Sequence, residues 1–182
     1  MVTLNSESIT NMKKYFLFAL MAFSLVSCEE ELTINNPTFE AMNSYDFWRA
    51  TKMTANVDNG NLVIVGATDS ENVTLFIQNY ESGKEYELGT TNYHVATYSK
   101  IEKDTVYLYS TSSSTGKGYI KLDAPEKQQD GTISGTFYAE MVPVDPTLVL
   151  PNTPLVNFNK GVFFRIPIVY PPIVETPETP NP

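Results

Sequence analysis

The single histidine of the 182-residue chain, His94, is the residue best suited by type to proton transfer at neutral pH. A Ser-His-Asp site would use it as the base, but the sequence has no Gly-x-Ser-x-Gly turn to present a nucleophile. A zinc site would need at least two more His or Cys side chains, and Cys28 is the one cysteine. We therefore expect neither a metal nor a cofactor, and we interpret His94 as a non-catalytic residue of a strand or loop.

Carboxylates are the most abundant reactive groups, with 21 Asp and Glu residues in the chain. Glu85 and Glu87 share one face of an alternating segment, and Asp104 and Asp123 flank others. Counting alone does not identify a pair at the separation that glycosidases use. We interpret these carboxylates as solvated surface charges, and we expect the protein not to be an enzyme.

Aromatic side chains are the remaining groups that could bind a ligand, and several alternate out of phase with the expected core of their strands. These are Tyr119, Tyr138 and Phe163, against the expected core residues Ile120, Phe137 and Phe164. An exposed row of aromatic rings on a sheet would form a platform for sugars, whereas rings covered on both sides would be structural. Tyr119, Tyr138 and the single tryptophan, Trp48, are the candidate ligand-binding residues.

The charge balance excludes one class of partner. Twelve Lys and Arg against 21 Asp and Glu give a formal net charge of −9. Such a chain has no basic stripe to neutralise phosphates, so nucleic acid is not an expected partner. Electrostatic binding to an anionic membrane surface is disfavoured for the same reason.

The first 27 residues have the organisation of an export signal. Met12-Lys13-Lys14 precedes a run of twelve mostly apolar residues, 15–26, which ends at Ser27-Cys28. This run is well short of the roughly 20 residues of a membrane-spanning helix, and it is typical of a secretory signal peptide. Because residues 1–11 contain no basic side chain, we expect translation to start at Met12.

Leu25-Val26-Ser27-Cys28 resembles the lipobox of bacterial lipoproteins, in which the cysteine thiol carries a lipid after cleavage. The resemblance implies that Cys28 is lipidated, palmitate included, and that lipid is the membrane partner of the protein. An acylated cysteine with several chains anchors a protein far more firmly than one myristoyl chain. Glu29-Glu30-Glu31 resembles an export signal of Bacteroidetes-type lipoproteins, which implies the outer membrane and favours the cell surface over the periplasmic face.

After the signal peptide, the composition predicts an acidic stalk over residues 28–38, a β-domain over 39–170 and a Pro-rich disordered tail over 171–182. Period-two alternation within the domain predicts about eight strands. They are expected at 47–57, 62–68, 73–80, 93–100, 105–111, 118–123, 132–141 and 158–168. The clearest places Ile133, Phe137, Ala139 and Met141 on a core face and Thr132, Ser134, Thr136 and Glu140 on a solvent face.

Turn chemistry connects these strands. Asn59-Gly60 suits a type I′ hairpin, and Thr115-Gly116 is expected to close 105–111 onto 118–123. The segment Pro143–Pro154 contains four prolines in twelve residues, which predicts a long loop. The expected fold class is all-β, an antiparallel meander that forms a sandwich or flattened barrel.

Four segments resemble a family of Bacteroidetes lipoproteins that carry a domain of unknown function. The segments are Phe47-Trp48-Arg49-Ala50, Gly83-Lys84-Glu85-Tyr86-Glu87-Leu88-Gly89 with Tyr98, Gly131-Thr132-Ile133-Ser134-Gly135-Thr136-Phe137, and Phe158-Asn159-Lys160-Gly161-Val162-Phe163. The resemblance implies the fold and the location, and it brings no catalytic residue.

These observations leave several functions open. The first is a non-enzymatic, lipid-anchored envelope protein that presents a β-domain to a protein partner or ligand. The second is a glycan- or nutrient-binding module of an outer-membrane uptake system, and the third is a carrier of a small apolar ligand. An exposed aromatic row would favour the second, an enclosed apolar cavity the third, and buried paired carboxylates in a cleft would favour an enzyme.

Overall fold

The computed structural model describes residues 36–170, and the alternation of apolar and polar side chains in this part of the chain produces an all-β domain. Eleven strands and one 3-10 turn lie within the described range. They are β1 (Thr38–Asn43), β2 (Asp46–Arg49), β3 (Lys52–Asp58), β4 (Asn61–Ala67), β5 (Glu71–Ile77), β6 (Glu85–Leu88), β7 (His94–Glu102), β8 (Thr105–Ser110), β9 (Lys117–Leu122), η1 (Pro125–Lys127), β10 (Thr132–Pro143) and β11 (Val156–Val169).

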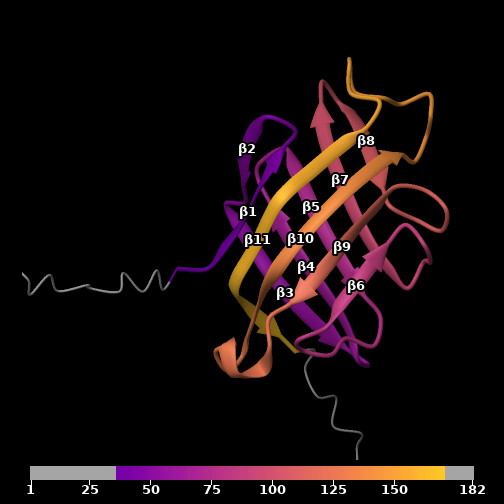
Figure 1. The fold of residues 1–182 in the computed structure, drawn as a ribbon. Helices are drawn as coiled ribbons and strands as arrows, with labels where there is room; N and C mark the ends of the chain where they lie inside the picture. The colour runs from indigo at the N-terminus through magenta and orange to yellow at the C-terminus, as the bar shows by residue number, and fades with distance from the viewer. Residues whose placement is uncertain (1–35, 171–182) are drawn as a thin grey trace, which may run out of the picture. The chain divides into compact units, whose positions relative to one another are not determined.

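The strands form two layers that are continuous at two corners (Figure 1). The front sheet has the order β2-β1-β11-β10-β9-β6, and the back sheet has the order β3-β4-β5-β7-β8. At one corner the end of β11 pairs in parallel with β3, and at the other the end of β10 pairs with β8. All pairings between the described strands except β11 with β3 are antiparallel, including β10 with β8, so the expected sandwich or flattened barrel is confirmed.

The strand count differs from the expected eight for a topological reason. The segment predicted as a single strand, 47–57, divides at Ala50 and Thr51 into β2 and β3. The Ala50 amide donates to the Phe39 carbonyl in the front sheet, whereas the Thr51 amide donates to the Ala67 carbonyl in the back sheet. The chain therefore changes sheets between two consecutive residues. The structure also contains β1 and β6, which are not among the predicted strands, so the number rises from eight to eleven.

Two of the predicted connections have the expected geometry, and one does not. Asn59 and Gly60 both have positive φ, 49° and 80°, which is the I′ hairpin geometry between β3 and β4. Residues 144–155 form the expected long loop. The prediction that Thr115-Gly116 closes a hairpin is wrong, because β8 lies in the back sheet and β9 in the front sheet.

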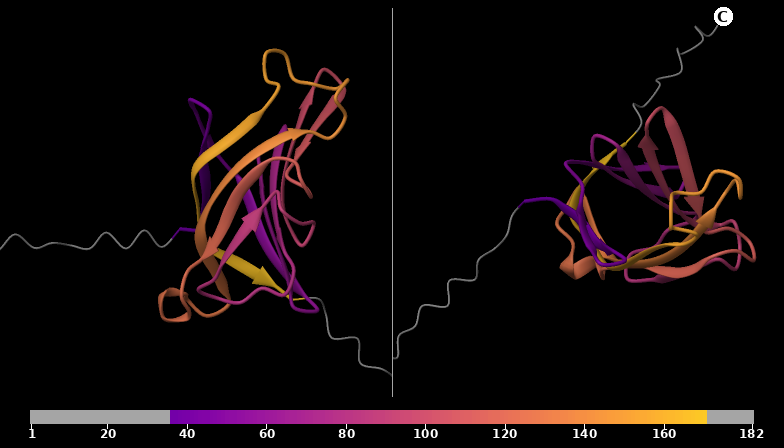
Figure 2. Two further views of the ribbon diagram at one scale, coloured as in Figure 1. Left: turned by 45° about the vertical axis from the view of Figure 1, so that its right-hand side comes forward. Right: turned by 90° about the horizontal axis from the view of Figure 1, so that it is seen from above.

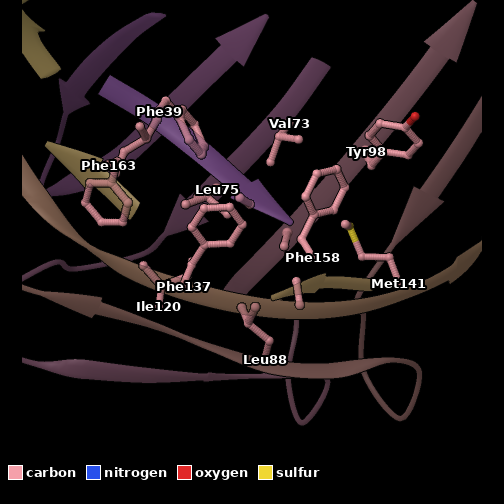
Figure 3. Packing of buried hydrophobic residues seen from close by; sticks show 14 of the residues in the cluster. Phe39, Val73, Leu75, Leu88, Tyr98, Ile120, Phe137, Met141, Phe158 and Phe163 are labelled. Carbon is pink, nitrogen blue, oxygen red and sulfur yellow. The ribbon is translucent and has the colours of Figure 1, made fainter. Parts of the chain in front are cut away.

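Aromatic rings from the front sheet fill the space between the two layers (Figure 3). Phe39 contacts Phe137 edge to face with ring centroids 5.4 Å apart, and Trp48 contacts Phe158 similarly at 5.6 Å. Edge-to-face pairs of this kind add about 0.5–1.5 kcal/mol each to the gain from burial. In the view from above, the two sheets curve toward one another around this core (Figure 2).

Two β-bulges bend β11 from the front sheet toward the back sheet. Phe137 and Ala139 of β10 pair with Gly161 and Phe158, so β11 has one extra residue there, and Lys160 has a φ of 50°. A second extra residue lies near Arg165, whose φ is also 50°. Bulges of this kind increase the local twist and bend of a strand.

The bulges change which side chains of β11 face the core. Phe163 is fully buried and Phe164 is partly exposed, so the expected phase of these two residues is wrong. The buried positions of β11 are Val156, Phe158, Gly161, Phe163 and Ile166, a set that strict period-two counting does not predict. Each bulge adds one residue and therefore inverts the alternation that follows it.

Candidate functional site

The outer face of the front sheet carries three neighbouring cross-strand pairs from β9 and β10. From one end to the other they are Lys117 with Glu140, Tyr119 with Tyr138, and Lys121 with Thr136. Alternation along β9 places Lys117, Tyr119 and Lys121 on the same face, and β6 adds Glu87 opposite Tyr119. A pair of aromatic rings therefore lies between two lysines. We call Lys117, Tyr119, Lys121, Tyr138 and Glu140 the tyrosine face.

The two tyrosine rings form the centre of this face. Their centroids are 6.2 Å apart and their planes make an angle of 37°. Tyr119 is 37% exposed, and Tyr138 is partly exposed. Two adjacent rings at the surface of a rigid sheet can stack on an apolar ring face, as the aromatic residues of carbohydrate platforms do.

Ion pairs fix the polar groups beside these rings. The Lys117 ammonium lies 3.2 Å from the Glu140 carboxylate, and the Lys121 ammonium lies 3.6 Å from the Glu85 carboxylate. The Tyr138 hydroxyl donates a short hydrogen bond to Glu140. The polar edge of the tyrosine face therefore offers both hydrogen-bond donors and acceptors in defined positions.

The same contacts set the protonation states of Tyr138 and Glu140. Burial, together with the hydrogen bond to Glu140, raises the pKa of Tyr138 to about 12. The Tyr138 hydroxyl lowers the pKa of Glu140, and Lys117 acts in the same direction. At neutral pH Tyr138 is therefore a neutral phenol and Glu140 an ionised carboxylate, which suits hydrogen bonding to a ligand.

Two further candidate residues have different surroundings. Trp48 is only 5% exposed and lies edge-on between Phe39 and Phe158, so its ring belongs to the core rather than to an exposed surface. Its indole N–H is buried without a hydrogen-bond partner among the described residues. The predicted lipidation site, Cys28, lies outside the described residues, as do the predicted signal peptide and the Pro-rich segment 171–182.

A pocket lies where the end of β5 meets the start of β7. It is an open pocket of about 360 Å³ lined by Gln78, Asn79, Tyr93 and His94. This pocket could not be predicted from a local sequence motif, because its residues come from two segments 14 or more positions apart. The signal that could have found it is the strand register, since Ile77 pairs with His94 and the residues beyond each must lie side by side.

His94 itself packs against the ring of Tyr86, with centroids 4.8 Å apart. Burial lowers the pKa of His94, and the adjacent Tyr93 backbone partly opposes this effect. The imidazole is therefore neutral at pH 7. Its Nδ1 atom is buried and has no hydrogen-bond partner among the described residues.

Two further features are absent from residues 36–170. This range contains no group of three His, Cys, Asp or Glu side chains that could hold a metal ion. It also contains no helix long and apolar enough to cross a membrane. Glu85 and Glu87 are both exposed on β6, where Glu85 pairs with Lys121.

The fold and the tyrosine face define an all-β two-sheet domain with an exposed aromatic surface. A family model, DUF6252, described as a domain of unknown function, matches residues 35–167. The chain belongs to this family. No curated protein and no solved structure matches the chain.

Proposed function

We propose that this protein is a non-enzymatic, lipid-anchored protein of the bacterial outer membrane whose β-domain binds glycan through the tyrosine face. The observation that carries the binding role is the pair of adjacent rings of Tyr119, which is exposed, and Tyr138, which is partly exposed, with centroids 6.2 Å apart on the outer face of the front sheet. The anchor is the lipid on Cys28, which the resemblance of residues 25–28 to a lipobox supports.

The chemistry of the tyrosine face favours binding over catalysis. A catalytic acid or base near pH 7 needs a pKa close to that value. The pKa of Tyr138 is instead raised to about 12, and that of Glu140 is lowered. These groups keep their protonation states during binding, so they are suited to hold hydroxyl groups while the rings stack on the sugar.

The interior gives less support to the alternative of an apolar-ligand carrier. Such a carrier holds its ligand between the sheets, where this domain places four fully buried phenylalanine rings. They are Phe39, Phe137, Phe158 and Phe163, and Phe39 contacts Phe137 and Phe163 directly. Binding at the tyrosine face requires no displacement of these rings.

The test is affinity electrophoresis of the full chain, purified in detergent, through gels that contain different soluble polysaccharides. We expect at least one neutral polysaccharide to retard the wild-type protein, and the Tyr119→Ala variant to migrate freely. Tyr119→Phe keeps the ring and should retain most of the retardation. Tyr45→Ala is the matched control, because Tyr45 is 96% exposed on the β1–β2 turn, away from β9 and β10.

Retardation that persists unchanged in Tyr119→Ala would overturn the assignment of the tyrosine face. If no polysaccharide retards the wild-type protein, the glycan-binding proposal is refuted. Presentation of the domain to a protein partner is then the remaining function. Hydrolysis of a polysaccharide in the same gels would contradict the non-enzymatic part of the proposal.

A further inference from the structure

The pocket at the ends of β5 and β7 has a lining that is polar but uncharged. Gln78 and Asn79 contribute carboxamides, Tyr93 a phenol and His94 an imidazole. Because burial lowers the pKa of His94, none of these four groups carries a charge at pH 7. An ionic ligand would find no opposite charge among them, so the lining favours a neutral ligand.

The four groups also define what a neutral ligand must offer. Each carboxamide has both hydrogen-bond donors and acceptors, and a neutral imidazole has one of each. A hydroxyl group can act as donor or acceptor and therefore pairs with any of them. Tyr93 is 60% exposed, so its ring is available to stack on a ring of the ligand. A ring that carries several hydroxyl groups meets both requirements.

Hydrogen bonds fix the backbone that carries the lining residues. The Gln78 backbone N–H donates to the Tyr93 carbonyl at 2.9 Å, and the Asn79 backbone N–H donates to the side-chain oxygen of Asn61 at 3.3 Å. The adjacent loop is fixed by the Tyr86 hydroxyl, which accepts from the Glu81 amide and donates to the Glu81 carbonyl. A preformed site loses less conformational entropy when it binds a ligand.

We infer that this pocket binds a small neutral polyhydroxylated ring, either a free monosaccharide or the terminal sugar of a glycan chain. The volume of about 360 Å³ lies in the lower part of the range of small-molecule sites, roughly 300–1,000 Å³. Tyr93 supplies the stacking surface, while Gln78, Asn79 and His94 supply the hydrogen bonds.

This site stands independently of the proposed function. Its lining residues belong to the back-sheet strands β5 and β7 and the segments that continue them, whereas the tyrosine face lies on β9 and β10 of the front sheet. No residue is common to the two. Either site can be correct when the other is wrong.

The test is isothermal titration of the full chain in detergent with glucose, galactose, mannose and N-acetylglucosamine, and with short oligomers of each. We expect one sugar to bind with a stoichiometry of one, and Tyr93→Ala to weaken binding roughly tenfold through loss of the stacking contact. His94→Phe keeps a ring against Tyr86 but removes the hydrogen bond, and it should also weaken binding. Tyr45→Ala is the control, because Tyr45 belongs to neither proposed site, and it should leave monosaccharide binding unchanged.

The oligomers distinguish the two sources of the ligand. Equal affinity for the monomer and the oligomer would identify a free monosaccharide as the ligand. Tighter binding of the oligomer, lost when its terminal sugar is methylated, would identify the end of a glycan chain as the ligand. Both results support the pocket. Absence of binding to every sugar, or binding unaffected by Tyr93→Ala and His94→Phe, would overturn the inference. Loss of monosaccharide binding in Tyr119→Ala but not in Tyr93→Ala would transfer the site to the tyrosine face.

Discussion

Ser134 shows how a single hydroxyl stabilises an irregular strand. The Arg165 amide lies at the second bulge of β11 and donates to the Ser134 hydroxyl at 2.9 Å. Ser134 is 1% exposed, although alternation along β10 predicts a solvent-facing position, so that expectation is wrong. The bulge disrupts the regular ladder between β10 and β11, and the serine supplies the hydrogen bond that the ladder does not.

We predict that Ser134→Ala lowers the free energy of unfolding by about 1–3 kcal/mol, because the Arg165 amide loses its acceptor in a partly buried position. Thr136→Ala, two residues along the same strand and exposed, should change it by less than about 0.5 kcal/mol. Urea denaturation of the two variants measures both values. Equal shifts would show that the Ser134 hydroxyl does not stabilise the bulge.

The lowered pKa of His94 predicts how the stability of the domain changes with pH. Burial lowers its pKa in the folded state, so the unfolded chain takes up a proton first as the pH falls. The contribution of neutral His94 to stability is therefore complete above its ordinary pKa of 6.5 and decreases as the pH falls from there toward the lower folded value.

The measurement is the urea midpoint of wild type and His94→Phe at several pH values between about 7.5 and 5. The wild-type midpoint should fall more steeply with acidification than the midpoint of the variant. Carboxylates titrate equally in both proteins, so the difference between the two curves isolates His94. A difference of opposite sign would mean that His94 is charged in the folded domain.

At the scale of the elements, β10 and β11 interlock through a reciprocal exchange of glycine and phenylalanine. Phe137 of β10 lies opposite Gly161 of β11, and Gly135 of β10 lies opposite Phe163 of β11. A Cβ atom added to Gly161 would lie 2.3 Å from the Phe137 ring, and one added to Gly135 would lie 2.5 Å from the Phe163 ring. Each glycine leaves space that the opposite ring occupies.

We predict that Gly161→Ala destabilises the domain by about 1–3 kcal/mol, because the new methyl group overpacks the core against the Phe137 ring. Val162→Ala, at the adjacent exposed position, is the control and should have a small effect. Phe137→Ala alone should cost about 3–5 kcal/mol through the loss of a large buried ring.

The double variant makes this interpretation testable. In the Phe137→Ala background no ring occupies the space beside Gly161, so adding Gly161→Ala should cost far less than it does in the wild type. Urea denaturation of the four proteins gives the coupling energy. Strict additivity would indicate that the glycine is needed for its backbone conformation and not for the approach of the ring.

At the scale of the whole molecule, the two sheets are held together by strands that belong to both. The ends of β10 and β11 leave the front sheet and pair with β8 and β3 of the back sheet. The loop 144–155 between β10 and β11 is anchored by the buried Tyr109 of β8. The Tyr109 hydroxyl accepts from the Leu150 amide and donates to the Thr153 carbonyl, both at 2.8 Å. These contacts join the two sheets and the long loop within the described residues.

We predict that Cys28→Ser releases the protein from the membrane fraction of the cells that express it, while the domain remains folded. The serine hydroxyl cannot carry the lipid that the lipobox resemblance implies, and the core that folds the domain lies within residues 38–170. Fractionation followed by urea denaturation of the released protein measures both parts. Recovery of the variant in the membrane fraction at the wild-type level would refute lipidation of Cys28.

The sequence by itself determined the class of the fold, because alternation, turn residues and prolines act over a few neighbouring residues. It was sufficient to predict the hairpin at Asn59-Gly60, the long proline-containing loop and the core positions Ile133, Phe137, Ala139 and Met141. It also indicated that Tyr119 and Tyr138 share the face opposite Ile120 and Phe137, and the strand pairing brings these two rings together.

Only the tertiary structure decided which strands are neighbours and where a strand changes sheets or adds a residue. A turn motif such as Thr115-Gly116 reverses the chain without specifying the partner strand, and a bulge in β11 inverts Phe163 and Phe164 without any change in composition. The burial of Trp48 and the meeting of Gln78 with His94 also depend on contacts between distant segments. Such contacts are set by packing across the whole core, which no local pattern of residues records.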